Sequence, residues 1–270
     1  MKKGGWQLCK GGLESFEKYV VPAFGGVWAQ EPVKRAALRK GDRILDVGSG
    51  TGIVARYAYQ SLGDSVDITG VDVNDIALDK AREISALNAA PIEWKQADVS
   101  TMPFSDAKFD VLLCQQGLQY FPDRSRALKE INRVLVDDGR IVFSVWRPIE
   151  FSPFYFELHK ALEKYINREA ASTLASAYTL GDPIQLKTLF EDARFKNIKI
   201  RIVIKQMRYS PLEEFLFGSL FASPFADDIL ALEEIVREEM FQAIRKSISN
   251  YIDDDGLAAP MECYVVSATK

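Results

Sequence analysis

Short apolar runs alternate with helical apolar stripes through the first half of the chain. The apolar runs predict five strands, at Asp42–Val47, Val66–Asp72, Ile92–Gln96, Phe109–Cys114 and Arg140–Trp146. Apolar residues at helical spacing predict the helices between them, over Thr51–Leu62, about Asn74–Asn88 and about Asp123–Val136. Such an alternation indicates repeated strand–helix–strand units and a parallel sheet that is buried on both faces. We therefore expect an α/β fold.

Helical patterns interrupt this sheet pattern at three places. Glu14–Arg39 predicts two helices, broken near Pro22 and Gly25-Gly26. Helical stretches at about 150–193 and 211–255 precede two further alternating strands, Ile198–Tyr209 and Glu262–Ala268. We expect an N-terminal helical lid over residues 1–40 and one sheet domain over 41–270 that carries the two insertions. The three helical additions are expected to gather as a lid over one edge of the sheet.

Composition narrows the class of protein. Of 270 residues, 47% are hydrophobic, and 34 basic against 38 acidic side chains give a net charge of −4. A polyanion binder usually carries a basic surplus, so this balance argues against a dedicated nucleic-acid protein. No run of about 18 apolar residues is present, which predicts that no helix spans a membrane.

The chain start and the cysteines indicate the compartment. The opening residues, MKKGGWQLCKGGLESF, lack the apolar core of about 7–15 residues that a secretory signal has. Cys9, Cys114 and Cys263 are far apart and odd in number, so they predict neither a disulfide framework nor a metal site. We expect a reduced, cytoplasmic protein without a bound metal.

The segment ILDVGSGTG at 44–52 lies where a predicted strand becomes a helix. Its glycines let the backbone turn tightly and approach a ligand with no Cβ in the way. The following helix supplies free N–H groups at its start. Ligands of open α/β sheets bind at the carboxyl ends of the strands, where this turn falls. For the turn alone, the alternative is a tight turn whose strand-end aspartate caps the helix.

Asp72 ends the second predicted strand, about 20 residues after Gly52. An acid at that distance from a glycine turn is placed to accept hydrogen bonds from a ribose diol, so we expect a ligand that contains a nucleoside. Dinucleotide sites usually have G-x-G-x-x-G, whereas this spacing is G-x-G-x-G. Asp46 would also repel a pyrophosphate and suit a cationic group such as an ammonium. Both features argue against NAD(P).

Five segments together resemble the class I S-adenosylmethionine-dependent methyltransferases, specifically the small-molecule branch similar to the ubiquinone and menaquinone biosynthesis enzymes. They are, in order, ILDVGSGTG, VDVN at 71–74, ADVSTMPF at 97–104, FDVLLCQQGLQYFPD at 109–123 and INRVLVDDGRIVFS at 131–144. The resemblance covers about residues 40–146 and the strands near 198–209 and 262–268. It implies a Rossmann-like, seven-stranded, mostly parallel sheet with helices on both faces, and S-adenosylmethionine as the cofactor.

The resemblance also implies a set of cofactor-binding residues. Asp46, the glycine turn and Gln115 would hold the methionine part, and Asp72 the ribose. Val73 would pack against adenine, which Asp98 and the Val99 backbone would hydrogen-bond. N-terminal helices of such proteins close over the cofactor, so the resemblance also implies Tyr19 and Trp28 as candidates for contact with the cofactor. The full set is Tyr19, Trp28, Asp46, Gly48, Ser49, Gly50, Thr51, Gly52, Asp72, Val73, Asp98, Val99 and Gln115.

Methyl transfer from a sulfonium is an in-line displacement, so positioning can supply most of the catalysis. A base is needed only if the acceptor must lose a proton, and the sequence shows no obvious catalytic residue. We expect Gln116, Gln119 and Tyr120 to face the acceptor, with a merely solvated loop as the alternative. The helical insertions match no family motif, so the acceptor is expected only to be small and apolar or amphipathic.

Other reactive or aromatic residues have plainer interpretations. His159, the only histidine, lies on a probable helix and is expected to be a packed or surface residue. Cys114 ends an apolar strand and is expected to be a core thiol. Phe154, Leu158, Ala161 and Tyr165 have the spacing of a buried helix face, which favours core packing over an acceptor pocket for most of them.

Two other functions stay open at this level. One is a protein that binds S-adenosylmethionine without catalysis, and the other is an NAD(P)-dependent oxidoreductase. A nucleic-acid methyltransferase is a weaker alternative because of the acidic charge balance. The oligomeric state is not predicted.

Overall fold

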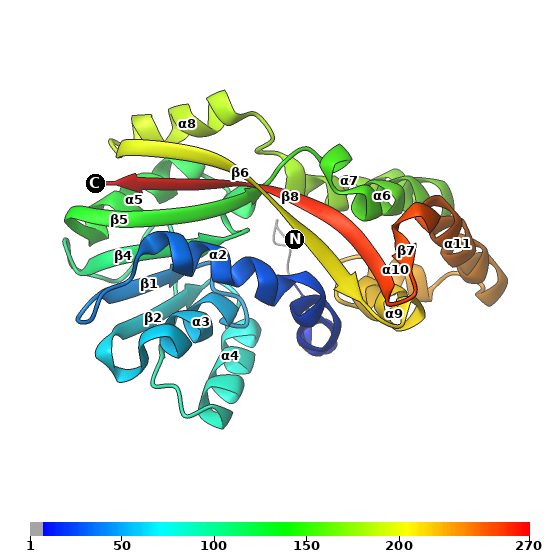
Figure 1. The fold of residues 1–270 in the computed structure, drawn as a ribbon, viewed down its shortest axis with the longest axis horizontal. Helices are drawn as coiled ribbons and strands as arrows, with labels where there is room; N and C mark the ends of the chain where they lie inside the picture. Colours follow the sequence, from blue (N-terminus) through cyan, green and yellow to red (C-terminus); the bar gives the residue numbers. More distant parts are fainter. Residues whose placement is uncertain (1–7) are drawn as a thin grey trace.

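One sheet of eight strands organises the computed structural model, which describes residues 8–270 (Figure 1). Residues 1–7, the start of the expected 1–40 lid, lie outside the described residues. Seven strands follow the order β3-β2-β1-β4-β5-β8-β6, and the two-residue β7 (Ile252–Asp253) pairs with β8. The predicted mostly parallel α/β sheet is confirmed, with β7 as an additional strand.

Five parallel strands carry the glycine segment and its neighbours. They are β1 (Arg43–Val47), β2 (Asp67–Asp72), β3 (Glu93–Gln96), β4 (Phe109–Gln115) and β5 (Leu135–Trp146). Their register places Asp46 beside Gly70 and Gln115 beside Ser144. Because the strands are parallel, the residues that follow their carboxyl ends meet at one edge of the sheet.

Strand β5 begins earlier than the sequence predicts. Leu135 already pairs with Phe109, and the register then shifts so that Arg140 lies opposite Val111. Asp138 has a φ of +62° within this irregularity. Asp138 and Gly139 therefore form a bulge inside the strand, which the sequence predicts to start only at Arg140.

Two long antiparallel strands complete the sheet. β6 (Lys196–Tyr209) and β8 (Gly256–Thr269) each have 14 residues and pair from Lys196 opposite Thr269 to Tyr209 opposite Leu257. β8 pairs with β5 only over Cys263–Thr269. The outer half of the β6–β8 ribbon thus runs beyond the parallel strands and reaches the helical additions (Figure 1).

Four helices flank the strands: α3 (Ile53–Leu62), α4 (Asp75–Leu87), α5 (Arg124–Val134) and α8 (Pro183–Asp192). Asn74, Asp123 and Asp182 cap three of them by accepting first-turn N–H groups. The sequence expected α8 to belong to the 150–193 insertion. It lies instead against α5 and β6, apart from the other added helices (Figure 1).

The N-terminal helices run on without the predicted break. α1 (Lys10–Ser15), the π-helical η1 (Phe16–Gly25) and α2 (Gly26–Ala36) follow one another directly. Pro22 lies inside η1, and the Gly26 N–H bonds the carbonyl of Val21, five residues back. The wider π turn accommodates a proline that an α-helix interior would exclude, so the predicted break near Pro22 is wrong.

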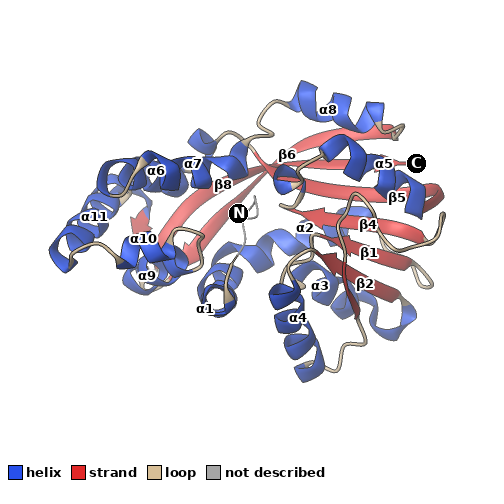
Figure 2. Cartoon of the chain, turned by 180° about the vertical axis from the view of Figure 1, so that it is seen from behind, coloured by secondary structure: helices blue, strands red, loops and turns tan. Residues whose placement is uncertain are grey.

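The remaining helices gather around the outer ends of β6 and β8 (Figure 2). Between β5 and α8 they are η4 (Ile149–Phe151), α6 (Pro153–Tyr165), α7 (Arg168–Ala175) and η5 (Ser176–Tyr178). After β6 they are α9 (Leu212–Phe221), α10 (Ala226–Leu230), α11 (Glu234–Ser247) and η6 (Ser249–Tyr251). Among residues 8–270, no helix has the length and apolar content to cross a membrane.

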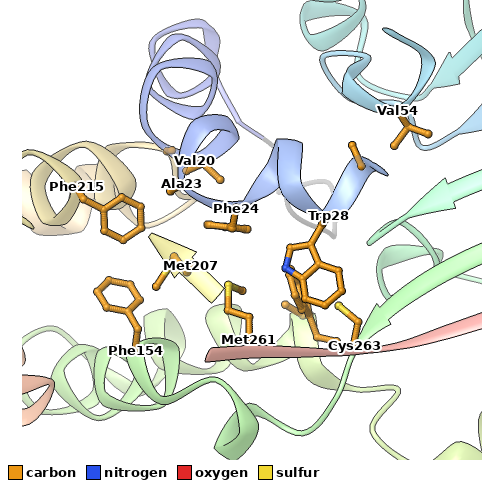
Figure 3. Close-up of a cluster of buried hydrophobic side chains, with 14 of the residues drawn as sticks. Val20, Ala23, Phe24, Trp28, Val54, Phe154, Met207, Phe215, Met261 and Cys263 are labelled. Carbon is orange, nitrogen blue, oxygen red and sulfur yellow. The ribbon is translucent and has the colours of Figure 1, made fainter. Parts of the chain in front are cut away.

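One apolar cluster joins these additions to the N-terminal helices (Figure 3). Phe24 and Trp28 from the N-terminal segment lie across from Phe154 of α6, with Met261 of β8 between them (Figure 3). Phe154, Leu158 and Ala161 are 1%, 3% and 7% exposed, which confirms the predicted core face for these three residues, whereas Tyr165 is half-buried.

Candidate active site

The glycine segment forms a tight turn between β1 and α3. Gly50 has a φ of +53°, and a methyl group at that position would have no neighbour within 4 Å. Gly52 has a φ of +84°, and a methyl group there would lie 2.2 Å from Cη2 of Trp94 on β3. Gly52 is therefore required for packing, whereas Gly50 leaves the backbone open on the side of the turn.

Asp72 ties the end of β2 to this turn. Its Oδ2 accepts a hydrogen bond of 2.8 Å from the Gly50 N–H, and its Oδ1 accepts one of 2.8 Å from the Asn74 N–H. Burial raises the pKa of the Asp72 carboxyl, while these backbone donors act in the opposite direction. The carboxylate lies beside the glycine backbone, as the spacing in the sequence predicts.

Asp46 is buried beneath the turn, with 1% of its surface exposed. Its Oδ2 accepts a hydrogen bond of 3.1 Å from the Ala55 N–H in the first turn of α3. Burial raises the pKa of Asp46 to about 7; the negative charge of Asp72 adds to the rise and Arg56 opposes it. A cationic group placed nearby would favour the ionised form of this carboxyl.

Three buried side-chain oxygens around the turn have no hydrogen-bond partner in the described part of the chain. They are Oγ of Ser49, Oγ1 of Thr51 and Oε1 of Gln115. Buried polar groups are nearly always hydrogen-bonded, so unpartnered ones indicate a missing water, ion or ligand. All three lie at the carboxyl ends of β1 and β4 and therefore fit a polar ligand held at this edge of the sheet.

The N-terminal helices close over the same edge. Glu17 of η1 forms an ion pair of 3.3 Å with Arg56 of α3, and Arg56 also donates to the carbonyl of Thr51. The Gln115 Nε2 donates a hydrogen bond of 3.2 Å to the carbonyl of Gly25. Sequence reasoning missed Glu17 and Arg56. The available signal was an arginine on the apolar side of α3, where an unpaired cation would be costly.

Tyr19 and Trp28 take part in packing. Tyr19 lies against Gly218 of α9, where a methyl group would come within 2.1 Å of the Tyr19 Cδ2. Trp28 is 1% exposed, and its ring lies 5.6 Å from that of Trp146 in an edge-to-face arrangement. Their expected contact with a cofactor stays a prediction.

The residues expected beside adenine follow β2 and β3. The Ala97 N–H bonds the carbonyl of Asp72 at 3.1 Å, which brings the two loops together. Asp98 is exposed and accepts from the Ser100 N–H at 2.7 Å, while Val99 is buried. Val73 is 51% exposed and presents an apolar side chain next to Asp72.

The loop after β4 is fastened to the sheet. Gln116 has a φ of +52°, and its Nε2 donates to Sγ of Cys263 at 2.9 Å. Gln119 is 4% exposed, and its Nε2 donates to Oε1 of Gln116 at 3.2 Å. A left-handed backbone at a non-glycine residue stores strain and is common at functional sites. These bonds hold the loop residues Gln116, Gln119 and Tyr120 in place.

The sequence predicts a core thiol at Cys114 and a packed or surface side chain at His159. Cys114 is 0% exposed, and burial raises the pKa of its thiol, which confirms a core residue. His159 lies on α6 and is half-buried, consistent with the expected packed or surface histidine.

The methyltransferase domain family matches residues 45–143, which contain most of β1, all of β2 to β4, the glycine turn, Asp72 and Gln115. The protein is therefore a methyltransferase, and its sequence is similar to the class I S-adenosylmethionine-dependent enzymes. This match supports methyl transfer and gives no support to the oxidoreductase alternative.

Relatives of this methyltransferase agree with the resemblance in its sequence. It is 29% identical over 185 residues to the ubiquinone/menaquinone biosynthesis C-methyltransferase UbiE of Francisella philomiragia, which covers 64% of this chain and 74% of that protein. It is 28% identical over 187 residues to a demethylmenaquinone methyltransferase of Staphylococcus aureus, with coverage of 65% and 76%.

A solved structure shows the same fold. Phosphoethanolamine N-methyltransferase 2 of Haemonchus contortus, in complex with S-adenosyl-L-methionine, superposes with a TM-score of 0.62. The superposition covers 97% of this methyltransferase and 57% of that chain at 20% identity. Identity at this level indicates a shared architecture and does not transfer the acceptor.

Proposed function

We propose that the protein holds S-adenosylmethionine at the carboxyl ends of β1, β2 and β4 and methylates a small apolar or amphipathic acceptor beside them. The observation that supports this site best is the set of unpartnered oxygens of Ser49, Thr51 and Gln115 around the glycine turn. The two buried carboxyls, Asp46 and Asp72, lie at the same turn.

Each side chain has a role in this proposal. Asp46, with the backbone of Gly48 to Gly52 and the oxygens of Ser49, Thr51 and Gln115, holds the methionine part. Asp72 accepts hydrogen bonds from the ribose hydroxyls. Val73, Asp98 and Val99 contact adenine. This assignment combines the family resemblance with the placement of all these residues at one edge of the sheet.

Bound S-adenosylmethionine supplies a methyl group on a sulfonium, whose thioether leaves without further activation. The chain then has to align the acceptor and exclude water, and orientation alone can contribute about 7–11 kcal/mol. The Asp46 carboxylate, largely shielded from solvent, stabilises the cationic charge of the bound group. The backbone N–H groups at the start of α3 orient the methionine part.

We propose the N-terminal helices, residues 8–36 of the expected 1–40 lid, as the cover of this site. The Glu17–Arg56 ion pair and the Gln115–Gly25 hydrogen bond fasten them to the sheet domain, residues 41–270. Tyr19 and Trp28 would then act by packing the lid in place.

The acceptor is proposed to be a flat, apolar ring of the quinone type. One relative is named as a ubiquinone/menaquinone biosynthesis C-methyltransferase and another as a demethylmenaquinone methyltransferase. Aromatic side chains also gather next to the loop after β4, with Trp146 contacting both Phe24 and Tyr178.

The absence of disulfides among Cys9, Cys114 and Cys263 in the described chain supports a cytoplasmic location.

The test is release of S-adenosylhomocysteine when the protein meets S-adenosylmethionine and a panel of acceptors. The panel contains a naphthoquinol, a catechol, a primary amine and duplex DNA. We expect turnover with a ring acceptor and none with DNA. Cofactor binding without turnover on any acceptor would favour the non-catalytic binding protein instead.

A further inference from the structure

Three tyrosines from separate segments lie beside the proposed methyl-transfer site. Tyr120 ends η3 (Leu118–Tyr120) after β4, Tyr155 lies on α6, and Tyr178 ends η5. The segments η3 and η5 contact each other and the strand β5. In agreement with this placement, Tyr120 and Tyr155 both raise the pKa of Tyr178 by their charge, and Tyr120 raises that of Tyr155.

Aromatic rings surround this tyrosine cluster, which consists of Tyr120, Tyr155 and Tyr178. The ring of Trp146, at the carboxyl end of β5, lies 6.4 Å from that of Tyr178 and 6.2 Å from that of Phe24. Phe24 in turn lies 6.0 Å from Tyr155. The cluster is therefore bounded by the N-terminal helices on one side and the sheet on the other.

The cluster differs from an ordinary apolar core. All three tyrosines are half-buried, whereas Phe154 on the same helix as Tyr155 is 1% exposed. The rings thus keep some exposed surface in an otherwise enclosed, aromatic setting.

Two buried polar side chains border the cluster. Ser152 is 1% exposed and Gln119 is 4% exposed. Ser152 acts as a hydrogen-bond partner of the Tyr178 hydroxyl, and Gln119 acts as one of the Tyr120 hydroxyl. A hydroxyl donates one hydrogen bond and can accept others, so these pairs keep capacity for a polar group of a ligand.

We propose that Tyr155 and Tyr178 recognise an oxygen atom of the methyl acceptor and so select a flat ring that bears a hydroxyl or carbonyl group. This inference rests on the proposed function, because it names the groups that hold the acceptor. Burial raises the pKa of both tyrosines, which keeps them protonated at neutral pH and able to donate. Ser152 and Gln119 supply acceptors for a hydroxyl hydrogen.

The charge around the cluster argues against an amine as the occupant. Aromatic rings can hold a cation, but the groups in the described chain that act most strongly on Tyr155 and Tyr178 include no carboxylate. A desolvated ammonium without a counter-charge would be costly to bind. An uncharged, oxygen-bearing ring fits the rings and the hydroxyls together.

Binding of two ring-shaped probes to the protein loaded with S-adenosylhomocysteine tests this inference. The probes are 2-naphthol and 2-methylnaphthalene, which differ mainly by the hydroxyl, with phenethylamine as a cationic probe. Calorimetry on the wild type should show 2-naphthol binding about 10-fold more tightly than 2-methylnaphthalene, since sites built for a hydroxyl discriminate against analogues that lack it. Tighter binding of phenethylamine, or no preference for 2-naphthol, would overturn the inference.

Tyrosine-to-phenylalanine variants test which hydroxyls produce the preference for 2-naphthol. The double variant Y155F/Y178F should bind 2-naphthol about 10-fold more weakly than the wild type and bind 2-methylnaphthalene equally tightly. The single variants Y155F and Y178F are measured in the same way. Y59F is the matched control, because the hydroxyl of Tyr59 on α3 donates to the exposed Asp64. Equal binding of both probes by the double variant and the wild type would refute the tyrosines as the selecting groups.

The experiment distinguishes failure of this inference from failure of the proposed function. Uptake of S-adenosylhomocysteine is measured in the same wild-type samples before the probes are added. If it does not bind, the proposed function fails, and 2-naphthol preference in the unloaded protein still decides the role of the tyrosines. If the double variant does not fold, the two single variants and the wild-type preference decide it.

Discussion

Glu17 and Arg56 join the N-terminal helices to the glycine turn through an ion pair of 3.3 Å. Their side chains are 17% and 8% exposed, so water screens the pair only weakly. Arg56 also donates to the carbonyl of Thr51, which belongs to the turn itself. One buried cation therefore connects the position of the lid to the shape of the proposed cofactor site.

Replacement of Glu17 by glutamine should destabilise the fold by about 1–3 kcal/mol, because it leaves the buried Arg56 charge without its counter-ion. Urea unfolding measures this loss. E163Q is the control, since Glu163 pairs with Arg168, whose side chain is 91% exposed. Exposed pairs contribute about 0–1 kcal/mol, so equal effects of the two substitutions would contradict the role of Glu17.

Asp46 should make stability depend on pH. Folding raises its pKa from the ordinary 3.8 to about 7, so the folded protein binds a proton that the unfolded chain has released between those values. The free energy of unfolding therefore falls as pH rises from 3.8 to about 7 and is level above that. D46N keeps an oxygen for the Ala55 N–H and removes the ionisation.

Accordingly, D46N should exceed the wild type in stability by about 2–4 kcal/mol at pH 8 and match it near pH 4. Denaturant titrations of both proteins at the two pH values provide the comparison. A stability difference of the same size at both values would show that Asp46 does not titrate in this range.

Gly52 should tolerate no side chain. In G52A the new methyl group would meet Trp94 at 2.2 Å while the backbone keeps a φ of +84°. We expect a loss of about 3 kcal/mol or more in the free energy of unfolding. G41A isolates the backbone part, since Gly41 has a φ of +87° and open space around it. It should lose about 1–2 kcal/mol, and a similar loss in G52A would mean that Trp94 moves aside easily.

D72A should weaken binding of S-adenosylhomocysteine by about 1–3 kcal/mol, measured by calorimetry. The carboxylate accepts from the Gly50 N–H, so its removal also loosens the glycine turn. D79N is the control, because Asp79 lies exposed on α4 and pairs with Arg82. Unchanged affinity in D72A would show that the end of β2 does not contact the ribose.

The sequence predicted those parts of the fold whose reasons are local. Alternating strands and helices identified the parallel sheet, and the glycine spacing with Asp72 identified the turn and its acidic neighbour. The break at Pro22 was predicted wrongly, because the π turn that accommodates this proline is stabilised by packing against α9. Sequence propensity cannot register such a tertiary contact.

Long-range partners of the site could not be predicted. Glu17 meets Arg56 across 39 positions of the chain, and Gln116 meets Cys263 across 147. The tyrosine cluster combines a loop after β4 with two helices of an insertion that matches no motif. These contacts depend on how the β6–β8 ribbon carries the helices, which no local spacing encodes.

A thermal shift with S-adenosylhomocysteine against NADH tests the central claim, that the glycine turn holds a methyl-donor cofactor. A ligand at about 100 times its dissociation constant stabilises a protein by about 2.7 kcal/mol. For a chain of this size the unfolding midpoint should rise by about 5–10 °C with S-adenosylhomocysteine and stay constant with NADH. A rise with NADH alone, or no rise with S-adenosylhomocysteine in such excess, would contradict the account.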